Sequence, residues 1–163
     1  MLNRIAIVFL LSSVSSALWA GDESYPPGVY KNGPDLMAAL AKAAQIPRTH
    51  PAAAEGSVPI ANADHYRINM VYRKTPGVAM THAVDPAKGS ELHYIVDGSA
   101  TVVTGGKLSG PNAGPTTTIV GGETRRVSKG DVLFLPAGTP HWYKEINGSV
   151  TYLEVRFDVE LKK

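Results

Sequence analysis

The sequence predicts an all-β domain, a closed barrel or sandwich, that follows one short helix. Gly and Pro are frequent, with 16 and 12 residues, and they separate short apolar runs as turns separate strands. From His65 onward the hydrophobic pattern has a period of two, which places alternate side chains on opposite faces of a strand. About nine short strands with turn signals between them are typical of a barrel or sandwich.

Composition narrows the class of protein further. The 163 residues favour one domain, and an apolar content of 44% is enough for a core. The formal net charge is only +2, without a basic block, so nucleic acid is not an expected partner. The chain has no Cys, which excludes disulfides and thiolate zinc sites. A metal would therefore need His and carboxylate ligands.

Residues 1–20 have the three parts of a secretory signal peptide. Arg4 supplies the positive charge, residues 5–11 are an uninterrupted apolar run, and cleavage is expected after Ala20, with Ala17 as the alternative. The apolar run is too short to span a bilayer, so we expect removal of the leader and no stable membrane span afterwards. The mature protein is then periplasmic or secreted.

The next segment, 21–64, is predicted to be an N-terminal arm that contains a helix over about 34–46. Pro34 suits a first helical turn and Pro47 is expected to stop the helix, while 48–63 reads as a Pro-rich linker. The apolar residues at helical spacing are Leu36, Met37, Leu40, Ala43 and Ala44. This stripe predicts a helix that packs on the outside of the barrel or on a partner subunit.

The barrel itself is predicted over 65–160. The expected strands are 66–73, 78–82, 91–96, 100–104, 117–120, 123–127, 132–135, 141–146 and 150–159. Hairpins are expected at Asp97-Gly98, Gly121-Gly122 and Asn147-Gly148, because Asn-Gly, Asp-Gly and Gly-Gly favour the tight turns between antiparallel strands.

One stretch carries a specific motif. Gly130, Pro136, Gly138 and His141 follow the spacing Gly, five residues, Pro, one residue, Gly, two residues, His. With this motif and the run from Glu91 to Gly98, the chain resembles the cupin superfamily, as a small single-domain, type-2-like cupin. The resemblance covers roughly 66–157 and implies a jelly-roll β-barrel. Cupins also carry a first motif with two His one residue apart, of which only the Glu-to-Gly half is present here.

The resemblance also implies a candidate metal site. Glu91 and His93 are two residues apart on a strand and share a face. The resemblance places ligands at His82, Glu91 and His141, and His93 could take the fourth position. Neutral imidazoles with one carboxylate suit Zn, Fe, Mn, Ni or Cu. The motif's second histidine is missing, because Val84 stands two residues after His82.

Other roles for these residues stay open. His82 could lie at a loop edge, His93 could be a satisfied interior histidine, and the turn before His141 could be structural. A buried Glu91 needs a partner, because isolated burial of a charge is costly, and the partner could be a metal or an arginine. The candidate arginines are Arg67, Arg73 and Arg156. Tyr143, Trp142 and Arg156 are further candidates for the wall of a ligand pocket.

Three functions are compatible with these residues. The first is a metal-dependent enzyme on a small molecule, in which the metal would activate water or dioxygen or polarise a carbonyl. The second is a non-catalytic, metal-free module that binds a ligand such as a sugar or an aromatic acid. The third is a structural module. A homodimer is expected, because the N-terminal helix needs a surface to cover. A fold alone does not select among these functions.

Overall fold

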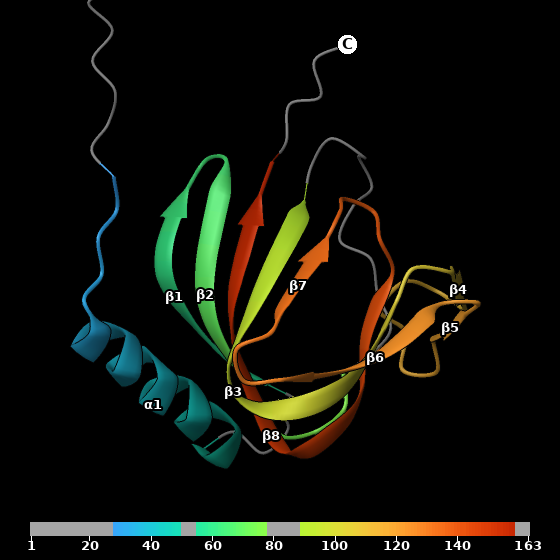
Figure 1. The fold of residues 1–163 in the computed structure, drawn as a ribbon, viewed down its shortest axis with the longest axis horizontal. Coiled ribbons are helices and arrows are strands. Elements are labelled where there is room, and N and C mark those ends of the chain that lie inside the picture. The colour runs from blue at the N-terminus through green and yellow to red at the C-terminus, as the bar shows by residue number, and fades with distance from the viewer. Residues whose placement is uncertain (1–27, 50–54, 78–88, 159–163) are drawn as a thin grey trace, which may run out of the picture.

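The computed structural model describes residues 28–49, 55–77 and 89–158. Within these ranges one helix precedes eight strands (Figure 1). Their bounds are α1 (Gly33–Thr49), β1 (Glu55–Ala63), β2 (Tyr66–Arg73), β3 (Ser90–Thr104), β4 (Lys107–Ser109), β5 (Thr118–Val120), β6 (Glu123–Ser128), β7 (Val132–Leu135) and β8 (His141–Phe157). The predicted all-β class with a short N-terminal helix is confirmed. The predicted leader, the predicted strand over 78–82 and the candidate ligand His82 lie outside the described residues.

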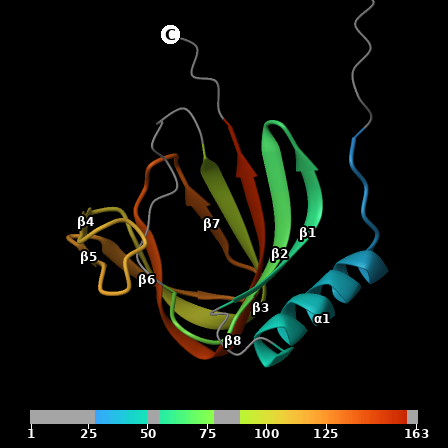
Figure 2. The ribbon, with the colours of Figure 1, turned by 180° about the vertical axis from the view of Figure 1, so that it is seen from behind.

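Six strands form one antiparallel sheet that curls around an interior (Figures 1 and 2). The order is β1-β2-β8-β3-β6, and β7 pairs with β3 next to β6. Strand β3 is long enough to pair with both β7 and β6, since residues 91–94 pair with β7 and residues 99–104 pair with β6. Strands β4 and β5 form a separate two-stranded ribbon. This curled arrangement agrees with the predicted jelly-roll barrel.

None of the three predicted hairpins is formed. The strands on either side of Gly121-Gly122 do not pair with each other, because β5 pairs with β4 and β6 pairs with β3. At Asp97-Gly98 and Asn147-Gly148, β3 and β8 continue through the predicted turns. Gly98 lies inside β3 and Gly148 inside β8, with φ of 77° and 76°. The β3–β8 ladder shifts register here, since Gly98 pairs with Val150 and Ala100 with Ile146. A Cβ on Gly98 would lie 1.9 Å from a backbone oxygen of the facing strand. These glycines therefore bend the long strands around the barrel through irregularities of the bulge type.

The Pro-rich segment expected as a linker contains β1, which pairs with β2 along its whole length. Strand β1 lies at the edge of the sheet and its register with β2 shifts between Pro59 and Ala61, and edges and bulges are where strands tolerate proline. The helix also runs further than predicted, to Thr49, with Pro47 inside it. The cost of Pro47 is confined to one lost bond, to the Ala43 carbonyl, in the last turn.

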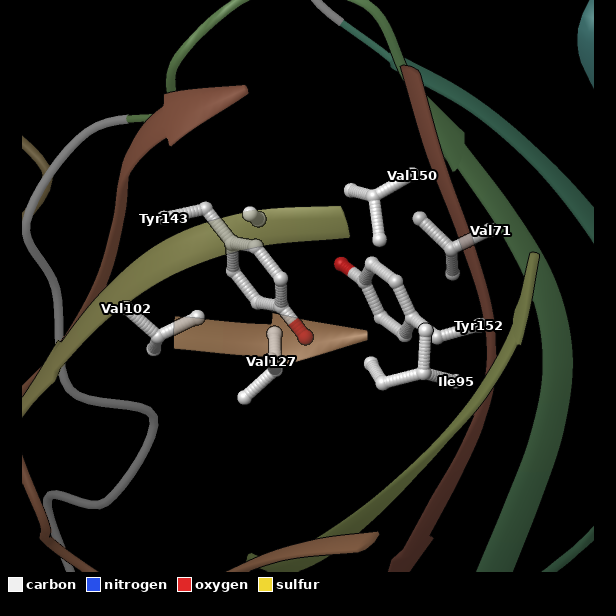
Figure 3. Packing of buried hydrophobic residues seen from close by; sticks show 8 residues of the cluster. Val71, Ile95, Val102, Val127, Tyr143, Val150 and Tyr152 are labelled. Carbon is white, nitrogen blue, oxygen red and sulfur yellow. The ribbon is translucent and has the colours of Figure 1, made fainter. Parts of the chain in front are cut away.

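Two apolar clusters hold the fold together. The first lies inside the barrel, where side chains from four strands converge (Figure 3). It contains Val71, Ile95, Ala100, Val102, Val127, Tyr143, Val150 and Tyr152. The second joins α1 to the outer face of β1 and β2 through Ala43, Val58 and Met70. The helix thus packs on the outside of the barrel as predicted, with Leu40 and Ala43 of the predicted stripe in this cluster, whereas Met37 is exposed. No helix within the described ranges has the length and hydrophobicity needed to cross a bilayer.

Candidate functional site

The strand register builds the site as three rows across β3, β8 and β2. The first row is Glu91, Arg156 and Arg67. The second row is His93, Glu154 and Asn69, and the third is Ile95, Tyr152 and Val71. Since residues two apart on a strand share a face, all three rows point into the barrel. Two polar rows therefore lie next to one apolar row along the inner face of the strands.

A cavity of about 270 Å³ opens above these rows. Its wall is mainly polar and comes from β1, β2, β3 and β8 with the segment after β2. The wall residues are Glu55, Ser57, Arg67, Asn69, Val71, Arg73, Gly77, His93, His141, Tyr143, Tyr152, Glu154 and Arg156. A small concave site with a few convergent polar groups is the usual form of a small-molecule site.

The most buried polar chain of the site runs from Glu91 through His93 to Tyr143. Glu91 and His93 are 2% and 1% exposed, and Glu91 Oε2 lies 3.1 Å from His93 Nε2. His93 Nδ1 lies 3.0 Å from the Tyr143 hydroxyl oxygen. The imidazole also stacks on the ring of Tyr152, with centroids 4.6 Å apart. Both ring nitrogens thus have partners, which holds the imidazole in one orientation.

Glu154 completes a cluster with Glu91 and His93 that sequence reasoning missed. One ligand atom from each of the three lies within 4.8 Å of the others. Glu154 Oε1 accepts a hydrogen bond of 3.1 Å from Asn69 Nδ2. The alternation of β8 does place Glu154 on the same face as Tyr152 and Arg156. What the sequence lacked was the register, which sets Glu154 directly opposite His93.

The same carboxylates are shared with two arginines. Arg156 Nη2 lies 3.4 Å from Glu91 Oε1 and 3.7 Å from Glu154 Oε2. Arg67 Nη2 lies 3.9 Å from Glu154 Oε1. Two carboxylates and two guanidiniums therefore alternate across the first two rows, and Arg156 is one of the arginines named from sequence as a partner of Glu91.

Arg73 supports the aromatic wall of the cavity. Its Nε donates a 3.0 Å hydrogen bond to the Tyr152 hydroxyl, and its Nη2 pairs with Glu55. The guanidinium carbon lies 5.6 Å from the centroid of the Tyr143 ring. Burial opposes the charge of Arg73, but Tyr152 and Glu55 outweigh it and raise the Arg73 pKa. This arginine stays charged and joins β2 to β8 and β1.

The two interior tyrosines stay neutral. Burial raises the pKa of Tyr143 well above its ordinary value, and Tyr152 raises it further, whereas Arg73 opposes the shift. Burial likewise raises the pKa of Tyr152 against the opposing effect of Arg73. The two rings lie almost parallel, with centroids 5.0 Å apart (Figure 3). At neutral pH both hydroxyls can donate hydrogen bonds into the site.

The remaining predicted residues divide into those at the cavity and those elsewhere. His141 is buried in the cavity wall, with its ring centroid 6.2 Å from that of His93. Its Nδ1 lies 3.2 Å from the Thr139 carbonyl oxygen; if Nδ1 donates, Nε2 carries the lone pair. Trp142 is not in the described cavity wall, and its indole N–H donates to the Gly77 carbonyl oxygen at 2.8 Å.

The donors present fit a divalent metal. One imidazole and two carboxylates converge at Glu91, His93 and Glu154, a set suited to first-row transition metals. A ligand imidazole usually has its second nitrogen hydrogen-bonded, as His93 has at Tyr143. A metal would have to compete with Arg156 for the carboxylate oxygens.

Comparison with known proteins adds a likeness of fold. No protein-family model matches the chain, and no curated protein matches it in sequence. Among solved structures it is similar to the cupin domain of Cnp3 from Schizosaccharomyces pombe, at 12% identity and a TM-score of 0.48, over 64% of this chain and 61% of that one. It is also similar to EutQ from Clostridium difficile, at 12% identity and a TM-score of 0.45, over 69% and 75% of the two chains.

A third similar structure is the DMSP lyase DddQ from Ruegeria pomeroyi, at 18% identity and a TM-score of 0.45, over 67% of this chain and 49% of that one. The chain thus spans less than two thirds of the Cnp3 structure and about half of the lyase. At these identities the likeness concerns the fold alone, and the chemistry of this cavity depends on its own residues.

Proposed function

We propose that the chain is an exported single-domain cupin whose barrel binds a small molecule next to a divalent metal held by Glu91, His93 and Glu154. The observation that carries the proposal is that one ligand atom from each of these three side chains lies within 4.8 Å of the others, with His93 and Glu154 at the wall of the cavity. The Gly130 to His141 motif supports the family, and it leads directly into β8, where His141 lines the same cavity.

A bound metal would supply Lewis-acid polarisation of a ligand oxygen, or activation of water or dioxygen. The chain's own residues would orient the side chains that hold the metal and would shield the bound small molecule. Asn69 holds Glu154, and the hydroxyl of Tyr143 holds the His93 imidazole. Zn, Fe, Mn, Ni and Cu are all compatible with one imidazole and two carboxylates.

A second function, a metal-free binding module, is favoured by one specific observation. Both oxygens of Glu91 already have partners, Arg156 at Oε1 and His93 at Oε2. A buried carboxylate compensated in this way needs no metal to balance its charge. In this case the cavity binds its ligand through the arginines, the tyrosines and His141 without catalysis.

Metal content separates the two functions. Elemental analysis of the processed protein, purified without added metal or chelator, should give close to one transition-metal ion per chain. Glu91→Gln, His93→Gln and Glu154→Gln should each lose the metal. Glu123→Gln and His65→Gln are matched controls, since both side chains are mostly exposed and neither forms an ion pair with a buried side chain. A metal-free wild-type protein that still binds ligands would favour the second function.

Export rests on the predicted leader. We propose that residues 1–20 are removed and that the barrel works in the periplasm or outside the cell. Mass measurement of protein recovered from the periplasm or medium should give a mature N-terminus after Ala20 or Ala17. Retention of the full chain in the cytoplasm would contradict this proposal.

We also propose that two copies pair through the outer face of β7, β3 and β8. The register forms two apolar rows on this face. They are Val132, Tyr94 and Leu153, and Phe134, Leu92 and Val155. Tyr94, Val132 and Phe134 are 44%, 60% and 52% exposed. An apolar patch of this kind can pack against its own copy around a two-fold axis without opposing like charges.

A further inference from the structure

Two guanidinium groups at one end of the cavity indicate the chemical class of its ligand. We propose that the cavity binds a small organic acid, whose carboxylate docks on the arginine pair Arg67 and Arg156. This inference rests on the proposed function, because it assigns a class to the small molecule that the barrel would hold. It is argued for the metal-free cavity, in which Arg156 pairs with both carboxylates.

The first step is the position of the pair. Arg67 on β2 and Arg156 on β8 lie directly opposite each other in the antiparallel register. Like charges in this arrangement repel, so the pair needs an anion nearby. Both side chains line the interior cavity, and both also line a second hollow of about 300 Å³ beside the β1–β2 turn. A ligand in either space would meet the same two groups.

The second step is that the protein's own carboxylates only partly satisfy this pair. The three distances from Arg67 and Arg156 to Glu91 and Glu154 lie between 3.4 and 3.9 Å. Charge-assisted hydrogen bonds between such groups are typically ~2.7–2.9 Å. Arg156 Nε is buried and has no hydrogen-bond partner within the described ranges. Buried donors nearly always have an acceptor from the protein, from water or from a ligand, so this one leaves a place for an acceptor atom from outside the chain.

The third step is a comparison with the remaining guanidinium of the cavity. Arg73 uses its Nε on the Tyr152 hydroxyl and its Nη2 on Glu55, and its guanidinium carbon lies over the Tyr143 ring. Its donors are directed at the wall. The unpaired donor of Arg156 therefore belongs to this site specifically and is not a general property of arginines in this barrel.

The last step selects the ligand. A guanidinium presents a planar fork of donors that matches a carboxylate. A monoanion suits the site better than a phosphate dianion, because Glu91 lies within 4 Å of Arg156 and Glu154 lies within 4 Å of both arginines, and these carboxylates would repel the second charge. The cavity of about 270 Å³ is near the lower end for ligand sites, and Tyr143 and Tyr152 give it a flat aromatic side. A small flat acid such as benzoate is a suitable probe.

Calorimetric titration of the chelator-treated mature protein tests the inference. Benzoate should bind, and benzamide, its neutral isostere, should bind at least tenfold more weakly. Arg156→Gln and Arg67→Gln should each weaken benzoate binding at least tenfold. Arg126→Gln, an exposed arginine on β6, is the matched control and should bind as the wild type does. A thermal melt of each variant confirms that it is folded.

Several outcomes would overturn the inference. Benzoate and benzamide could bind equally well, or benzoate could bind both arginine variants as tightly as the wild type. Inorganic phosphate could bind in place of carboxylates, or neither benzoate nor propionate could bind at all. If Arg156→Gln does not fold, Arg67→Gln decides, because the Arg67 side chain is 45% exposed and its loss is easily tolerated. The metal proposal is tested separately by elemental analysis, so either can fail while the other stands.

Discussion

His93 Nε2 lies 3.1 Å from Glu91 Oε2, and both side chains are almost completely buried. The two residues are neighbours on the inner face of β3, so their contact is local and depends little on the rest of the barrel. What the barrel adds is Arg156 on the other oxygen of Glu91, from the facing strand β8. Glu91 thus connects the imidazole of the site to its arginine pair.

Removal of the Glu91 charge should destabilise the metal-free protein. Glu91→Gln leaves Arg156 with one carboxylate fewer and His93 without its anion, and breaking a buried ion pair in this way typically costs about 3–5 kcal/mol. Urea unfolding measures the change. Glu123→Gln, which removes an exposed pair with Arg125, should change the free energy of unfolding by less than about 0.5 kcal/mol. Equal stability of the two variants would contradict the role given to Glu91.

The raised pKa values of Tyr143 and Tyr152 predict a loss of stability at alkaline pH. The unfolded chain releases these protons near pH 10, whereas the folded chain retains them, so the unfolded state binds fewer protons above pH 10. The free energy of unfolding should be fully present below pH 10 and should then fall by up to about 1.4 kcal/mol per pH unit for each tyrosine.

Absorbance of tyrosinate provides the measurement. In the folded protein the two interior tyrosines should ionise only when the protein unfolds. Tyr143→Phe should reduce the slope of stability against pH above 10, while Tyr30→Phe, whose ring is 82% exposed, should leave it unchanged. Ionisation of every tyrosine before unfolding would show that the interior rings are not buried as described.

Much of the site was predictable from period-two alternation alone. It correctly placed Glu91 with His93, and Tyr152, Glu154 and Arg156 together on one face. It could not pair the strands, because the order β2-β8-β3 joins segments separated by long stretches of chain. Without that order, nothing in the sequence showed that Glu154 faces His93.

Two of the three wrong hairpins have a related cause. A glycine with positive φ after Asp or Asn suits a tight turn, but it equally suits a bend within a long strand. Gly98 and Gly148 serve the second purpose, since both flanking segments continue the same β3–β8 ladder. Short-range signals cannot distinguish a reversal from a bend when the partner strand is distant in sequence.

Gly56 predicts a stability effect at the contact between helix and sheet. A Cβ at this position would lie 1.9 Å from the carbonyl oxygen of Ala43 in α1, whose usual helical donor is replaced by Pro47. Gly56→Ala should push the helix from β1 and cost about 1–3 kcal/mol, as overpacking does. Gly33→Ala, with nothing within 4 Å, is the control and should be near neutral. Thermal or urea unfolding of the two variants would distinguish them.

Arg73 should not be replaceable by lysine. Lysine keeps the charge but cannot both donate to the Tyr152 hydroxyl and pair with Glu55 from a planar fork. Arg73→Lys should lower the free energy of unfolding by about 1–3 kcal/mol, the usual cost of a buried group left unsatisfied. Arg125→Lys, in an exposed pair, should change it very little. Retention of full stability by Arg73→Lys would show that the fork geometry is unimportant.

The apolar outer face makes a prediction about assembly that is independent of the cavity. Phe134 is half exposed and stacks on Phe157 at a centroid distance of 6.3 Å. Phe134→Lys places a charge within the proposed contact, where pairing would have to bury it in an apolar face. Sedimentation equilibrium should find a dimer for the wild type and a monomer for this variant. Met37→Lys alters an equally exposed residue of α1 and should remain dimeric, because that residue lies on a different element. A Phe134→Lys dimer of unchanged affinity would place the contact elsewhere on the molecule.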